Sequence, residues 1–155
     1  MSTLVLGLGN TLLSDEGIGI HVIDHLQNQP GLPLNVSFMD GGTLSFTLAG
    51  PIEESDNLIV IDAAELNTAP GTVSVFSGPD MDQYLGTNRK RSVHEVGLID
   101  LMNIARLTDR LPARRALIAI QPERVDWGEQ PSPKVATAIP EACNQVLAIL
   151  REWHP

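Results

Sequence analysis

The chain has 155 residues, a formal net charge of −9 and 43% hydrophobic residues, which is the size and composition of one globular domain with a full core. The negative charge and an aromatic content of only 4% argue against nucleic acid or an anionic membrane surface as a partner. No apolar run approaches the ~20 residues of a membrane span, and a single cysteine suits a reducing cytoplasm. We therefore expect a single cytoplasmic domain over residues 1–155 that is a monomer, without a membrane or nucleic-acid partner.

Strand and helix patterns alternate along the chain. Apolar runs predict strands at about 3–8, 34–39, 57–61, 72–76 and 116–120. Helical spacing predicts helices at about 15–28, from Thr43, at 94–107, and from Ser132-Pro133 to Trp153, where Pro140 should kink or split the helix. Residues 77–93 are expected to be a long connection that returns across the domain.

The order of these elements predicts the fold class. Residues 63–71 are too few for the ~12-residue crossover that joins parallel strands, so the strand at 72–76 should be antiparallel. The almost wholly apolar strand at 57–61 is typical of a central parallel strand covered on both faces. We expect an α/β fold: a three-layer sandwich whose twisted, five-stranded, mostly parallel sheet has one antiparallel strand and helices on both faces.

The turn after the first strand is the most informative motif. Gly7 and Gly9 precede a helix, as in nucleotide-binding strand–turn–helix units, but Leu12 stands where the third glycine is expected. The turn instead carries Asp15 and Glu16, which would repel a pyrophosphate and are good ligands for a cation. The motif therefore predicts either a metal or catalytic acid site, or two acids that merely offset the helix dipole.

Three acidic residues follow the first three strands. Glu16, Asp40 and Asp62 should meet at the carboxyl edge of the sheet, where His94 is expected to open a helix. Carboxylates and one imidazole in a cleft form an open site suited to Zn, Ni or Fe. Each residue also has a structural alternative, because Asp40 and Asp62 could cap the following turns and His94 could be an ordinary helix-start residue.

Two other clusters have simpler interpretations. His21 and His25 are spaced i, i+4, but the glutamate of an H-E-x-x-H motif is absent, and both are expected on a solvated helix face. A basic run at Arg89-Lys90-Arg91 predicts a solvated loop. The alternative is that this run docks an acidic surface or tail.

Taken together, the motifs resemble those of the endopeptidases that mature the large subunit of nickel–iron hydrogenases. The resemblance covers nearly the whole chain, and the ordered set of motifs is more specific than any one of them. The matching segments are GLGNTLLSDEGIG at 7–19, DGGT at 40–43, the apolar strand ending at Asp62, SVHEVGL at 92–98, IQPE at 120–123 and the Ser132-Pro133 helix start.

The resemblance implies an endopeptidase that removes a short C-terminal extension from the hydrogenase large-subunit precursor after nickel insertion. It implies that Glu16, Asp62 and His94 bind metal, with Asp62, Glu16 and Asp40 as the catalytic candidates. Nickel would arrive with the substrate, and Zn or Cd could act as a surrogate. The metal could activate water itself, or it could serve only for recognition while a carboxylate acts as base. A non-catalytic nickel-sensing chaperone and a nucleotide-binding module are the alternative functions.

Overall fold

The computed structural model describes residues 1–87 and 97–155 and contains a five-stranded sheet. Its strands are ordered β2-β1-β3-β5-β4. Neighbouring strands are parallel except β4, which runs antiparallel to β5, so the predicted mixed sheet is confirmed. The strands are β1 (Thr3–Leu8), β2 (Val36–Gly42), β3 (Asn57–Ala63), β4 (Val73–Ser77) and β5 (Arg114–Ile120).

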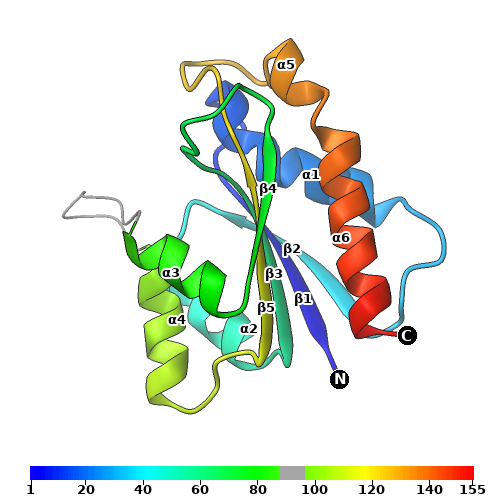
Figure 1. Ribbon diagram of the computed structural model, residues 1–155, viewed down its shortest axis with the longest axis vertical. Helices are drawn as coiled ribbons and strands as arrows, with labels where there is room; N and C mark the ends of the chain where they lie inside the picture. The colour runs from blue at the N-terminus through cyan, green and yellow to red at the C-terminus, as the bar shows by residue number, and fades with distance from the viewer. Residues whose placement is uncertain (88–96) are drawn as a thin grey trace.

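Helices cover both faces of the sheet, as Figure 1 shows. One face is covered by α1 (Ile18–Gln27) and α6 (Ile139–Trp153), and the other by α2 (Ala49–Glu53), α3 (Pro79–Thr87) and α4 (Leu98–Leu107). Three short helices complete the described elements: η1 (Ser14–Gly17), η2 (Phe46–Leu48) and α5 (Pro133–Ala136). The predicted three-layer α/β sandwich is therefore confirmed.

The central strands contribute to two separate cores because successive side chains point to opposite faces. Val5 of β1 packs with α1 and α6, whereas Leu4 and Leu6 pack with the helices on the other face. All six residues of β1 are buried, and β3 is buried from Asn57 to Ile61. These strands are therefore continuous apolar runs rather than alternating ones.

Helix α3 was missed by the sequence analysis, which expected a plain connection at 77–93. Its first turn carries Asp80 and Asp82, and Met81 is its buried apolar residue, so the apolar periodicity is weak. The second strand also begins later than predicted, at Val36, because Leu34 is fully exposed in the preceding loop. Helix α4 begins at Leu98 within the described residues, and the expected helix start at His94 lies outside them.

The last helical region is split, as Pro140 predicted. Helix α5 ends at Ala136 and α6 begins at Ile139, which places Pro140 in the first turn of α6. A first-turn residue needs no N–H for an intrahelical hydrogen bond, so proline is tolerated there. Ser132 directly precedes α5, but its side chain forms no capping hydrogen bond with that helix.

Among the described residues, no helix is both long enough and apolar enough to cross a bilayer.

A carboxylate on α3 ties that helix to the sheet. Asp82 accepts hydrogen bonds from Nε and Nη2 of Arg115 at 2.9 and 2.6 Å, and Arg106 of α4 lies 3.4 Å from the same carboxylate. The hydrogen bonds from Arg115 hold the pKa of Asp82 below its ordinary value, although partial burial opposes them. This contact matters for function because α3 supplies one wall of the pocket described below.

We predict that Asp82→Asn lowers the free energy of unfolding by about 1.5–3 kcal/mol at neutral pH, the range for hydrogen bonds to a charged group. Folding lowers the pKa of Asp82 from its ordinary value of 3.8. The stabilisation that the ionised carboxylate contributes to the folded protein is therefore fully present above pH 3.8, and it is lost as the pH falls through the lower pKa of the folded state. Denaturant titrations should therefore show that the difference in free energy of unfolding between the parent chain and Asp82→Asn shrinks below pH 3.8. Asp80→Asn, an exposed change in the same helical turn, is the matched control. A difference that persists unchanged in acid would contradict the ion-pair explanation.

Candidate active site

The carboxyl edge of the sheet brings the predicted acidic residues to one side of the domain. In the parallel register, Gly7 of β1 is paired with Asp40 of β2 and with Ile61 of β3. Asp62 follows Ile61 directly, so the two aspartates lie on the strands that flank β1 near its end. The predicted common edge for these two residues is confirmed.

Two glycines set the position of the turn that carries Glu16. Gly9 has φ +132°, and a Cβ on it would clash with the carbonyl oxygen of Glu16. Gly19, in the first turn of α1, lies so close to the carbonyl oxygens of Ile61 and Leu8 that a Cβ there would also clash. The start of α1 therefore packs directly on the ends of β1 and β3. This close approach places the turn containing Glu16 beside β3, the strand that carries Asp62.

Asp15 is a structural anchor, a role that neither interpretation of the motif included. Its buried carboxylate accepts hydrogen bonds from the backbone N–H groups of Glu123, Arg124 and Ser132 at 2.8, 2.7 and 2.6 Å. The hydroxyl of Ser132 donates a fourth, at 2.8 Å. Burial alone would raise the pKa of Asp15, but these donors outweigh it and the pKa lies below its ordinary value.

The β5–α5 loop is fixed against the turn by main-chain hydrogen bonds as well. The N–H of Ser14 donates to the carbonyl of Gly128 at 2.8 Å, and the N–H of Gly128 donates to the carbonyl of Leu12 at 2.9 Å. The N–H of Asp15 donates to the carbonyl of Arg124 at 3.0 Å. The turn is thus held from the sheet side by glycine contacts and from the other side by this loop.

Glu16 remains available for chemistry. It is half-buried, and its carboxylate accepts no hydrogen bond from any residue in 1–87 or 97–155. The adjacent acids Asp15 and Glu16 therefore differ completely in their surroundings. Of the two, Glu16 is the one that could contact a metal ion or a substrate group.

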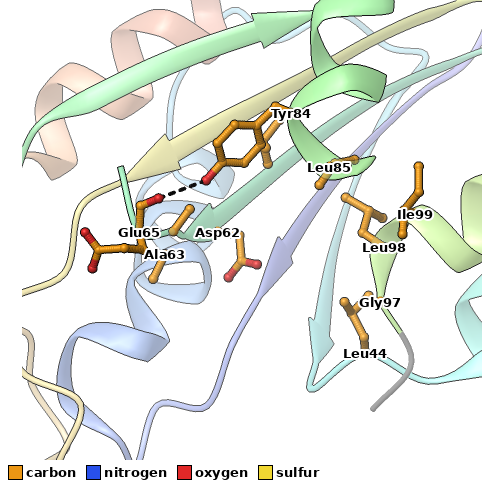
Figure 2. Close-up of a pocket in the computed structure, with 11 residues that line it drawn as sticks. Leu44, Asp62, Ala63, Glu65, Tyr84, Leu85, Gly97, Leu98 and Ile99 are labelled. Atoms are coloured by element: carbon orange, nitrogen blue, oxygen red, sulfur yellow. Dashed lines mark hydrogen bonds between the residues drawn. The ribbon is translucent and has the colours of Figure 1, made fainter. Parts of the chain in front are cut away.

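Asp62 lines a pocket of about 260 Å³ (Figure 2). Glu65 and Tyr84 are the other polar side chains of the pocket, and the Tyr84 hydroxyl donates to the carbonyl oxygen of Glu65 at 3.3 Å. Burial, together with the charges of Asp62 and Glu65, raises the pKa of Tyr84, so this hydroxyl stays protonated at neutral pH. The sequence analysis missed Tyr84, and its only distinguishing signal is that it is the single tyrosine of the chain.

Asp40 lies in a different hollow. It is exposed, and its Oδ1 accepts a hydrogen bond from the N–H of Gly42 at 2.8 Å. Asp40 thus caps the turn that follows it, which the sequence analysis gave as the structural alternative to a functional role. The surrounding hollow, of about 290 Å³, is formed with Gly9, Asn10 and Thr43 among others. Asp40 and Asp62 thus share the sheet edge but line separate depressions.

The remaining predicted residues divide into those described and those outside the described range. His25 is exposed as expected, and its Nδ1 lies 2.9 Å from the carbonyl oxygen of His21. The solvated-face prediction is wrong for His21, which is half-buried with no hydrogen-bond partner for Nε2 in the part of the chain that is described. His94 and the run from Arg89 to Arg91 lie outside the described residues.

Metal binding by the described residues alone is not supported by their arrangement. Within residues 1–87 and 97–155, no three His, Cys, Asp or Glu side chains gather closely enough to hold an ion. Glu16 and Asp62 are two oxygen donors at one edge, which is an incomplete ligand set for Zn or Ni. Such a pair suits a metal ion whose other ligands come from elsewhere.

Known proteins similar to this chain include hydrogenase maturation proteases. The family model described as hydrogenase maturation protease matches residues 20–149. The hydrogenase 2 maturation protease of Escherichia coli K12 is 38% identical over 98% of this chain and 92% of that protein. The hydrogenase expression/formation protein HupD of Rhodobacter capsulatus is 37% identical over 97% of this chain and 71% of that protein.

The fold agrees with these sequence relationships. The solved structure of the hydrogenase maturating endopeptidase HybD from Escherichia coli superposes with a TM-score of 0.91 at 35% identity, covering 99% of this chain and 94% of that chain. The alternative of a nucleotide-binding module receives no support from any of these relatives.

We predict that Asp15→Asn destabilises the protein by about 3 kcal/mol, because an amide nitrogen would face buried N–H donors that need an acceptor. Hydrogen exchange should accelerate at the amides of Glu123, Arg124 and Ser132, which donate to the carboxylate. The matched control is Asp126→Asn, an exposed acid in the same loop, which should leave the free energy of unfolding nearly unchanged. Equal stability of Asp15→Asn and the parent chain, measured by denaturant titration, would contradict the anchoring role.

Proposed function

We propose that this chain, which belongs to the hydrogenase maturation protease family, removes the C-terminal extension of a nickel–iron hydrogenase large-subunit precursor after nickel insertion. The family resemblance expected from the motifs is confirmed, and with it the enzyme class, a peptide hydrolase. The observation that carries the proposal is that Glu16 and Asp62 lie at the same edge of the sheet in a member of this family, and that the carboxylate of Glu16 accepts no hydrogen bond from the described residues.

The acidic residues can serve recognition and chemistry together. Amide hydrolysis needs a polarised carbonyl, an activated water and a proton for the leaving amine. Glu16, Asp62 and His94 would contact the nickel that the precursor carries, and a metal ion so held would supply Lewis acidity. Asp62 would take the proton of the attacking water, and Asp40 is the second candidate for that role, in aspartyl-type catalysis. Gly41 and Gly42 would let the substrate backbone approach closely.

Nickel belongs to the substrate in this proposal rather than to the resting enzyme. The described residues supply two oxygen donors, which should bind a free ion weakly and gain affinity when the precursor's ligands share it. Zn or Cd would bind to the same two carboxylates as a surrogate for nickel. The lone cysteine supports a cytoplasmic location, and we propose that the enzyme acts as a monomer.

We predict that Glu16→Gln, Asp62→Asn and His94→Ala each lower the rate of precursor processing by at least about 100-fold, because each removes a group that acts on the reacting centre. All three variants should retain the parent circular dichroism spectrum, since the changes remove charge or a ligand rather than core volume. His25→Ala, an exposed change on α1, is the control and should process normally. Full activity in folded Asp62→Asn would refute the site assignment.

We further predict that cleavage follows nickel insertion and does not precede it. A difference in binding of ~3–4 kcal/mol would make the enzyme prefer loaded over empty precursor by a few hundred-fold. Purified enzyme should be offered equal amounts of both precursors, and the shortened product followed by intact-mass measurement. Equal cleavage of the two forms would exclude metal-gated recognition, and binding without any shortening would indicate a nickel-sensing chaperone.

A further inference from the structure

An exposed apolar surface lies where the β5–α5 loop meets the turn that contains Glu16. Trp127 and Val125 of the loop are 78% and 58% exposed, and Leu12 of the turn is 50% exposed. None of the three belongs to either core. Single exposed apolar residues are normal, but a tryptophan is usually well buried, so an exposed one with apolar neighbours indicates an interaction surface. These three residues form the Trp127 patch.

The backbone pairing of the turn and the loop brings the patch together. Leu13 forms a parallel bridge with Gly128, and the N–H of Gly128 donates to the carbonyl of Leu12 at 2.9 Å. Leu12 and Trp127 directly precede the two bridge residues, so they lie side by side on adjacent backbones, which are about 4.7–4.9 Å apart in such pairings. Val125 is two residues before Trp127 in the same loop. The patch is therefore one surface built from two segments that are distant in sequence.

The patch and Glu16 belong to one fixed unit at the carboxyl end of the sheet, where β1 and β5 end (Figure 1). The N–H of Glu16 donates to the carbonyl of Leu13 at 3.1 Å, and the hydroxyl of Ser14 donates to the carbonyl of Asp126 at 2.8 Å. The carboxylate of Asp15 binds the loop from the same turn. A surface fixed in this way loses little conformational entropy when a partner covers it.

The charges around the patch are mainly acidic. Glu123, Asp126 and Glu129 are exposed in the same loop. Arg124 pairs with Asp126 at 3.1 Å, and Nζ of Lys134 lies 3.6 Å from the carboxylate of Glu123. Glu129 forms no ion pair with the residues that the structure describes, and the whole chain carries a net charge of −9. Charge complementarity therefore favours a partner with basic side chains around an apolar centre.

We propose that the Trp127 patch binds the folded body of the hydrogenase large-subunit precursor, through an apolar surface of the precursor that basic side chains surround. The inference rests on the proposed function, because the precursor is the protein on which the site at Glu16 and Asp62 would act. The patch and Glu16 share one turn–loop unit, so a precursor whose nickel lies at Glu16 also covers the patch. Two contacts with the same partner strengthen each other, since the second forms within the complex.

A second copy of this chain is a poorer partner for the patch. A symmetric dimer places the same surface of both subunits face to face. It would therefore bring two acidic loops together, each with Glu123, Asp126 and Glu129, and like charges would repel each other.

The test measures binding separately from cleavage, with the full-length chain and with nickel-loaded and nickel-free precursors. We expect Trp127→Ala to raise the Kd for both precursors by about 10–100-fold, the range for an aromatic side chain at the centre of an interface. The factor should be the same for both, because the patch contacts protein rather than metal. Asp62→Asn, in contrast, should raise the Kd only for the loaded precursor. Weakening of the loaded precursor alone by Trp127→Ala would overturn the assignment.

Kinetics distinguish binding by the patch from a disturbed active site. Trp127→Ala should raise KM and leave kcat near the parent value, as expected when an interaction is lost equally from the bound substrate and the transition state. Trp127→Phe should keep most of the affinity. Leu12→Ala should weaken binding, whereas its matched control Leu34→Ala should not. Leu34 is fully exposed in the loop before β2, at the opposite edge of the sheet.

A charge reversal tests the nature of the partner surface. Glu129→Lys should slow association with the precursor at low salt, and the difference from the parent chain should shrink as the salt concentration rises. Faster association of Glu129→Lys would overturn the assignment of a basic partner surface.

The outcomes separate the docking surface from the protease function. If the parent chain binds and shortens the precursor and Trp127→Ala does so with the same Kd and KM, the docking assignment is overturned and the protease proposal stands. If Trp127→Ala weakens binding of a precursor that the parent chain never shortens, docking is supported and the protease proposal fails. Self-association of the parent chain that Trp127→Ala abolishes, measured by sedimentation, would assign the patch to a second copy and overturn the proposal.

Discussion

The hydrogen bonds to the buried carboxylate of Asp15 are the interaction on which the site depends most. This side chain joins the first turn of the chain to the β5–α5 loop, in which its partner Glu123 lies 108 residues later. An ionised carboxylate without partners would be costly to bury, but four donors converge on this one and keep it charged. The turn is therefore held in one place, together with the neighbouring Glu16, whose carboxylate accepts no hydrogen bond from residues 1–87 or 97–155.

The first turn is held in place both by close backbone contacts and by a charged side chain. Gly9 and Gly19 let the turn and the start of α1 approach the ends of β1 and β3 more closely than any side chain would allow. Asp15 then fastens the outer side of the same turn. Two adjacent acids thus have different surroundings: Asp15 holds the turn to the loop, and the half-buried Glu16 lies at the sheet edge. A nucleotide-binding turn, by comparison, leaves bare N–H groups at this position to receive a phosphate.

The pocket behind Asp62 is assembled from the opposite layer of the domain. Helix α3 brings Tyr84 and Leu85, and the ion pair between Asp82 and Arg115 secures that helix against β5. The pocket and the acidic edge are therefore built by different helices around the end of one strand.

The sequence alone determined the sheet, the antiparallel strand, the break near Pro140 and the edge shared by Asp40 and Asp62. Each of these follows from local signals: apolar runs, connection length, proline chemistry and the position of acids directly after strands. Only the tertiary structure decided that Asp15 is an anchor, that Asp40 lies in a different hollow from Asp62, and that α3 forms a pocket wall. The reason is that these features depend on partners distant in sequence. The N–H of Ser132 lies 117 residues from the carboxylate it satisfies. The weakly amphipathic α3 is tied to the sheet through Arg115, which lies 33 residues from its partner Asp82.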